Sequence, residues 1–136
     1  MRSNKIRSKA HQKIYVGGIQ IYGNLYDVDD KYIINLRFLE HILKEAVKTA
    51  GMHILKVTKQ RYKIRYGNVV GVSIIALLAE SHIVLHTWPE GSYVTIDIFS
   101  CGKKKGAQKA CKYIISSLKP SRYELYEVNR GHFVNR

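Results

Sequence analysis

The spacing of apolar residues constrains this chain most, because it alternates between two periods that belong to strands and to helices. The stretch from Val69 to Leu78 is apolar and rich in β-branched side chains, which is typical of a central buried strand. Two later stretches alternate apolar and polar residues, as half-buried strands do: Ile83 and Leu85, then Val94, Ile96 and Ile98. Pro89 and Gly91 mark a turn between them. The centre of the chain therefore predicts adjacent antiparallel strands.

Weaker strand signals flank this centre. Residues 14–26 predict a first strand with a break at Gly17 and Gly18. Residues 53–57 and 61–66 predict two short strands around a Lys-Gln turn, and residues 123–128 predict the last strand. The polar residues 27–35 are expected to form a connection.

Two stretches carry the helical period instead. Asn35 is a suitable N-cap for the first helix, which Gly51 would end. The apolar stripe of this helix is formed by Leu39, Leu43, Ala46 and Ala50. The second stripe, which ends before Pro120, is formed by Ala107, Ala110, Cys111, Ile114, Ile115 and Leu118. We expect Cys111 to be a core residue.

Strands and two helices in this order predict an α+β fold, a two-layer sandwich in which both helices cover one face of an antiparallel sheet. The length of 136 residues fits a single domain, which we place at residues 14–136. A chain of this size buries about two thirds of its surface on folding, which is enough for a core.

The net charge of +13 is concentrated in two places. Residues 1–13 carry five basic residues and no acidic one, and Lys103, Lys104 and Lys105 form a basic loop. Charge blocks of this kind are usually flexible and solvated, so residues 1–13 are expected to be a flexible tail. A nucleic-acid surface requires basic residues spread along one face with exposed aromatic residues, so nucleic-acid binding remains a remote alternative.

Three features that the sequence lacks indicate the cellular setting. The two cysteines make no disulfide framework, the basic N-terminus has no apolar stretch after it, and the longest apolar run, residues 69–79, is too short to span a membrane. We therefore expect a cytoplasmic protein without a membrane partner.

The reactive side chains gather between Gly71 and Gly102. Glu80, Ser81 and His82 are consecutive at the end of a buried strand, His86 follows, and Cys101 comes directly after another strand. Such residues at strand ends are candidates for a catalytic site.

Three common kinds of site fit this cluster poorly. Zinc would need a further cysteine to complete a tetrahedral set with the two histidines, so we expect no metal. A serine-hydrolase elbow needs G-x-S-x-G, which Ala79-Glu80-Ser81-His82-Ile83 does not provide. A papain-type Cys-His pair lacks its local signature. The residues by themselves indicate only a polar cluster that is a candidate for catalysis.

The segment Glu80-Ser81-His82, four residues, then Thr87-Trp88-Pro89-Glu90, with Cys101-Gly102 downstream, resembles the small prokaryotic and archaeal S-adenosylmethionine decarboxylase family. The resemblance runs from about residue 15 to residue 131. It implies a self-cleaving proenzyme, cut between Glu80 and Ser81 into chains 1–80 and 81–136, with a pyruvoyl cofactor made from Ser81 and no metal. The ketone is needed because the substrate amine forms a Schiff base that takes up the electrons released with CO₂.

The same resemblance implies a role for each site residue. Ser81 attacks the carbonyl of Glu80, His86 takes the Cα proton of Ser81, and Ser73 assists processing through a hydrogen bond at that carbonyl. Cys101 is the matching proton donor in decarboxylation, since a thiol is a suitable acid near neutral pH. Glu90 is expected to contact polar groups of the substrate.

The resemblance leaves the substrate open between two amino acids. No His-x-Phe stretch precedes Gly71, where this family places an aromatic residue against adenine, so Tyr66 or Tyr62 would have to replace it. The segment Tyr22-Gly23-Asn24-Leu25-Tyr26 resembles the archaeal arginine decarboxylases of the family. Phe99 and residues 129–131 resemble the S-adenosylmethionine branch equally well. We favour L-arginine, giving agmatine and CO₂, over S-adenosylmethionine, which would supply the aminopropyl donor for spermidine; both serve polyamine biosynthesis.

The resemblance also implies a homodimer of cleaved protomers, with sheets paired across a two-fold axis and sites at the interface. Burial of the second sheet face would help a chain of this size.

Overall fold

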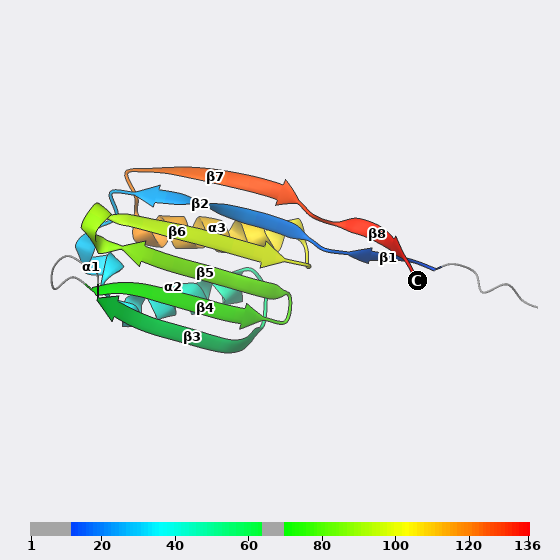
Figure 1. The fold of residues 1–136 in the computed structure, drawn as a ribbon, viewed down its shortest axis with the longest axis horizontal. Coiled ribbons are helices and arrows are strands. Elements are labelled where there is room, and N and C mark those ends of the chain that lie inside the picture. The colour runs from blue at the N-terminus through cyan, green and yellow to red at the C-terminus, as the bar shows by residue number, and fades with distance from the viewer. Residues whose placement is uncertain (1–11, 64–69) are drawn as a thin grey trace, which may run out of the picture.

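Six antiparallel strands form the main sheet in the order β3-β4-β5-β6-β2-β7 (Figure 1). The computed structural model describes residues 12–63 and 70–136. The strands are β2 (Ile19–Tyr26), β3 (Ile54–Lys63), β4 (Val70–Leu78), β5 (Ser81–Trp88), β6 (Tyr93–Ser100) and β7 (Arg122–Asn129). The sequence placed β4, β5 and β6 next to each other, and the structure confirms this.

Two helices, α2 (Leu36–Thr49) and α3 (Lys104–Leu118), pack side by side on one face of the sheet (Figure 1). Asn35 caps α2 as predicted, because its side-chain oxygen accepts a hydrogen bond of 3.0 Å from the backbone N–H of Phe38. The predicted α+β two-layer fold is confirmed. Within the two described stretches, no helix is long and apolar enough to cross a membrane.

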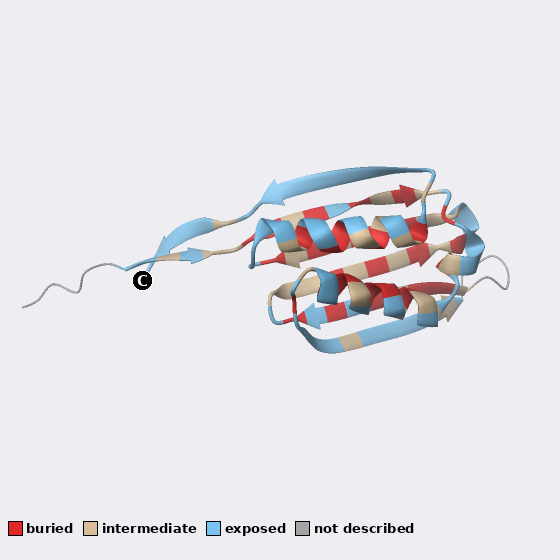
Figure 2. Ribbon diagram, turned by 180° about the vertical axis from the view of Figure 1, so that it is seen from behind, coloured by how far each residue is buried: buried red, intermediate tan, exposed pale blue. Residues whose placement is uncertain are grey.

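The core lies between this helix pair and the sheet (Figure 2). Alternate residues of β5 and β6, such as Ile83, Leu85 and Ile96, are at most 1% exposed and face the helices. Cys111 is buried in the same core, as expected for the second helical stripe. No described helix covers the opposite face, called here the open face, where half-buried polar and aromatic residues alternate with the core positions.

A two-stranded ribbon extends from the end of the sandwich (Figure 1). It consists of β1 (Lys13–Val16) and β8 (His132–Asn135). Gly17 and Gly18 separate β1 from β2, so the predicted strand over 14–26 is divided at its Gly-Gly break. Gly17 has a φ of +89°, and a Cβ on Gly18 would lie 2.0 Å from the carbonyl oxygen of Ser100. Of the basic tail, residues 1–11 lie outside the described part of the chain.

Three predictions about connections are wrong. Lys104 and Lys105 begin α3, with Lys103 at its N-cap position, and do not form a basic loop. Residues 54–63 form one continuous strand, β3, rather than two strands around a Lys-Gln turn. As an edge strand β3 pairs only with β4, and most of its residues are exposed, so it shows no apolar alternation. The expected polar connection after β2 contains a short helix, α1 (Asp30–Ile33), capped by Asp29. Four residues are too few to show a helical period.

Candidate active site

The first part of the site lies where β4 turns into β5. We call residues Glu80, Ser81 and Cys101 the turn group. Ser81 pairs in register with Ser100, which places Cys101 beside the turn. The backbone N–H of Cys101 donates a hydrogen bond of 2.8 Å to the carbonyl oxygen of Glu80. The bond between Glu80 and Ser81 therefore has a polarised carbonyl.

Ser81 has a strained backbone, with a φ of +148°. L-residues with side chains rarely adopt this conformation, which costs about 1–3 kcal/mol. Ser81 directly follows Glu80, so the strained residue is also the one whose hydroxyl is nearest in sequence to the Glu80 carbonyl. Cys101 is exposed, so its thiol is accessible at the same place.

The second part of the site is on the open face, in the middle of β5. Ser73 of β4 and His86 of β5 are cross-strand partners, and the Ser73 hydroxyl oxygen lies 2.5 Å from His86 Nδ1. Tyr62 of β3 stacks on the His86 ring, with centroids 5.2 Å apart, and its hydroxyl lies 2.8 Å from His86 Nε2. We call Tyr62, Ser73, His86 and Glu90 the face group.

The proton of the Tyr62 hydroxyl determines which ring nitrogen of His86 is protonated. The Tyr62 hydroxyl contacts both the Thr87 carbonyl oxygen, which only accepts, and His86 Nε2. All contacts are satisfied when Tyr62 donates to Thr87 and accepts from a protonated His86 Nε2. His86 Nδ1 is then unprotonated and accepts from the Ser73 hydroxyl. We assign this tautomer from the hydrogen-bond network.

The surroundings of His86 favour its neutral form. Burial lowers the pKa of His86 below its ordinary value of 6.5, and the charge of Glu90 opposes this in part. Burial, with a smaller contribution from Glu90, raises the pKa of the Tyr62 phenol, so Tyr62 keeps its proton. A neutral imidazole with an unprotonated Nδ1 is suited to act as a general base.

The chain does not bring the two groups together. Ser81 and His86 are five residues apart on β5, which corresponds to about 16 Å at about 3.3 Å per residue. Ser81 pairs with Ser100, which is 1% exposed on the helix-covered side, whereas His86 pairs with Ser73 on the open face. Within one chain, His86 therefore lies far from the Cα proton that the resemblance assigns to it.

The remaining candidates are Glu90, Tyr66 and its alternative, Tyr62. Glu90 is exposed in the 3-10 turn Pro89–Gly91 and acts on His86 and Tyr62 through its charge. Tyr66 lies outside the described residues. Tyr62 is predicted as an aromatic platform, and the sequence does not indicate its hydrogen bond to His86. Gly71, the cross-strand partner of Tyr62, leaves room for the ring, since a Cβ there would lie 2.3 Å from it.

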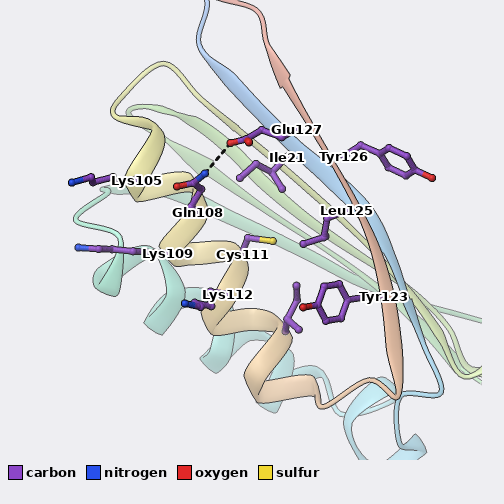
Figure 3. Close-up of a pocket in the computed structure, with 11 residues that line it drawn as sticks. Ile21, Lys105, Gln108, Lys109, Cys111, Lys112, Tyr123, Leu125, Tyr126 and Glu127 are labelled. Carbon is purple, nitrogen blue, oxygen red and sulfur yellow. Dashed lines mark hydrogen bonds between the residues drawn. The ribbon is translucent and has the colours of Figure 1, made fainter.

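A groove of about 670 Å³ lies elsewhere, between α3 and β7 on the helix side (Figure 3). Its lining includes Ile21, Cys111, Leu125 and the lysines 105, 109 and 112. Burial raises the pKa of the Cys111 thiol to about 11, which makes it a poor nucleophile. This groove contains no member of the turn group or the face group.

Known proteins are similar to this chain over most of its length. Residues 19–131 match the family model described as S-adenosylmethionine decarboxylase. The chain is 38% identical to an arginine decarboxylase proenzyme of Pyrobaculum arsenaticum, over 93% of both chains. It is 41% identical to an S-adenosylmethionine decarboxylase proenzyme of Sulfurisphaera tokodaii, over 85% of this chain and 90% of the relative.

A solved structure is similar over most of the chain. The crystal structure of the adenosylmethionine decarboxylase from Aquifex aeolicus superposes with a TM-score of 0.74 and 33% identity, covering 84% of this chain and 90% of that one. The family match and the fold agree over most of the chain. The protein belongs to the S-adenosylmethionine decarboxylase family and is a decarboxylase.

Proposed function

We propose that the chain is a proenzyme that cleaves itself between Glu80 and Ser81 and forms a pyruvoyl cofactor from Ser81. The observation that carries this proposal is the hydrogen bond from Cys101 N–H to the Glu80 carbonyl, next to a strained Ser81. A donor aimed at a carbonyl oxygen stabilises the negative charge that develops when the carbonyl is attacked. The relatives' designation as proenzymes is consistent with such processing.

Processing requires two bond exchanges and a final hydrolysis. The Ser81 hydroxyl adds to the Glu80 carbonyl carbon, the amide C–N bond breaks, and an ester joins Glu80 to the Ser81 side chain. A base then removes the Cα proton of Ser81, and the Cβ–O bond breaks to release Glu80 as a carboxylate. Residue 81 is left as dehydroalanine, which tautomerises to an imine. Water adds to the imine carbon, the C–N bond breaks, and ammonia leaves to give the pyruvoyl group.

The base in the second exchange is His86 of a second copy of the chain. The neutral Nδ1 of His86 has the right protonation state, but the Ser81 of its own chain is about 16 Å away. Ile75 and Leu77, 44% and 50% exposed, lie on the open face between the face group and the turn group. A second sheet packed there would bury them and bring its own Ser73 and His86 to the turn. The functional unit is thus a homodimer.

Decarboxylation uses the same turn. The pyruvoyl group supplies an electron-withdrawing ketone for a substrate with a free α-amine. Cys101, exposed and adjacent to residue 81, donates a proton to the carbon that loses CO₂. Glu90, in the face group of the second chain, holds a polar or cationic group of the substrate.

We favour L-arginine as the substrate, because Glu90 offers a carboxylate for a guanidinium and the Pyrobaculum relative is an arginine decarboxylase proenzyme. S-adenosylmethionine is the second candidate. It is favoured by aromatic rings on the open face: Trp88 lies 4.1 Å from His86 and 5.2 Å from Tyr93, between ring centroids, and such rings stack on adenine.

Intact mass spectrometry under denaturing conditions tests the processing. Two fragments, 1–80 and 81–136, the second with a pyruvoyl terminus, are expected from the wild-type chain, and one uncut chain from Ser81→Ala. Release of labelled CO₂ from carboxyl-labelled arginine or S-adenosylmethionine then identifies the substrate. A wild-type chain that stays uncut after long incubation at elevated temperature contradicts the proposal.

A further inference from the structure

His53, directly before β3, contacts the residue on the acyl side of the proposed cleavage point. We propose that His53 is a positioning residue for self-cleavage, which holds Glu80 so that the strained backbone of Ser81 cannot relax. This inference rests on the proposed function, and it assigns to His53 a role that the polar cluster at residues 80–82 did not indicate.

Three hydrogen bonds join His53 to the turn. The backbone N–H of Ala79 donates to the carbonyl oxygen of His53 at 2.9 Å, which extends the β3–β4 ladder by one residue. The backbone N–H of His53 donates to Glu80 Oε2 at 3.1 Å. His53 Nδ1 lies 2.8 Å from Glu80 Oε1. Both carboxylate oxygens of Glu80 therefore have a donor from one residue.

The charge state of Glu80 determines which group donates the hydrogen bond between His53 Nδ1 and Glu80 Oε1. Hydrogen bonds from His53 lower the pKa of the Glu80 carboxyl, so the group is ionised and can only accept. His53 Nδ1 is then the donor. The Glu80 side chain is 19% exposed, compared with 77% for His53, so the shielded partner is the one in the turn.

Glu80 is held on its other side by the strand end. Its carbonyl oxygen accepts a hydrogen bond of 2.8 Å from the backbone N–H of Cys101, directly after β6. The side chain and the main chain of Glu80 are thus fixed by different elements. The φ of +148° at Ser81 could otherwise be relieved by rotation of the two-residue turn, and the bonds to His53 oppose that rotation.

The proposed role ends when the chain is cut. After cleavage Glu80 is the C-terminus of chain 1–80 and is no longer bonded to residue 81. Loss of the His53 side chain should therefore slow processing, while the decarboxylation rate per pyruvoyl group changes little. A general structural role would reduce both.

The experiment compares freshly synthesised His53→Ala, His53→Asn and His41→Ala chains by the time course of cleavage. The amide of the His53→Asn variant would place its Nδ2 donor where His53 has Nδ1, and His41 is an exposed histidine on α2. His53→Ala is expected to cleave at least about tenfold more slowly, the size of effect that a small misplacement causes. His53→Asn and His41→Ala are expected to stay within about threefold of wild type. Turnover of the cleaved His53→Ala fraction, and its melting temperature, should match wild type.

Hydroxylamine locates the affected step, because it cleaves an accumulated ester but not the amide. If His53 favours ester formation, hydroxylamine does not restore fast cleavage of His53→Ala. Wild-type rates in His53→Ala, or an equal loss in His53→Asn with normal melting, overturn the inference. If the wild-type chain itself remains uncut, the proposed function fails and not only the role of His53.

Discussion

The separation of Ser81 from His86 leads to a quantitative prediction about mixed dimers. Ser81→Ala chains lack the nucleophile, and His86→Ala chains lack the base, so neither variant alone should cleave. If the base comes from the second chain, a heterodimer contains one complete site, formed by Ser81 of one chain and His86 of the other. With equal amounts and random pairing, about half of the His86→Ala chains have a Ser81→Ala partner. We therefore expect about half of them to be cut.

The assay is coexpression of the two variants with distinguishable tags, followed by intact mass spectrometry. Only the His86→Ala chain should yield fragments 1–80 and 81–136, and the Ser81→Ala chain should remain whole. The distance behind this expectation is about 16 Å within one chain, compared with roughly 3 Å for proton transfer. Absence of cleavage in a sample shown by native mass spectrometry to contain heterodimers would refute the reasoning.

Three further predictions concern single side chains. Thr87→Val removes the buried hydroxyl that accepts from Val72 N–H at 2.9 Å, so unfolding in denaturant should show a loss of about 1–3 kcal/mol; an unchanged stability contradicts this. Burial lowers the pKa of His86, and only its neutral form is a base, so the cleavage rate should fall only below pH 6.5. The charge of Glu90 raises the pKa of His86, so Glu90→Gln should move this fall to lower pH. A shift to higher pH contradicts the assignment. Cys101→Ala should still be cut, because its backbone N–H remains, but should release CO₂ at least about 100-fold more slowly; an unchanged rate excludes the thiol as the proton donor.

The sequence predicted most elements of the fold because their burial is periodic. β5 and β6 alternate between the core and the open face, and α2 buries Leu39, Leu43 and Ala46 on one stripe. The sequence does not predict β3 as one strand, because an exposed edge strand needs no alternation of apolar and polar residues. Its Lys59-Gln60 pair, taken alone, is typical of a turn. Apolar periodicity arises where one face of an element is buried, so it gives no signal for a strand that is paired but exposed.

The candidate site was predictable in its residues but not in its arrangement. The motif named Ser81, His86 and Cys101 together, and strand pairing does bring Cys101 to Ser81. It could not show that the face group is separate, because closeness within a short motif is easily taken for closeness in space. The motif does not include Tyr62 or His53. Their contacts with the site depend on the pairing of β3 with β4, which joins residues far apart in the sequence.

The spacing of the motif follows from the sheet. Ser81 opens β5, Ser100 closes β6, and the two are paired, so Cys101 is necessarily the first residue beyond the hairpin and next to the turn that precedes Ser81. His86 pairs with Ser73 because the β4–β5 turn contains only two residues, Ala79 and Glu80. A change of one residue within a strand would reverse which side chains face the core. The spacing between the site residues of this sequence is therefore a requirement of strand register, and that same register keeps Ser81 and His86 of one chain apart.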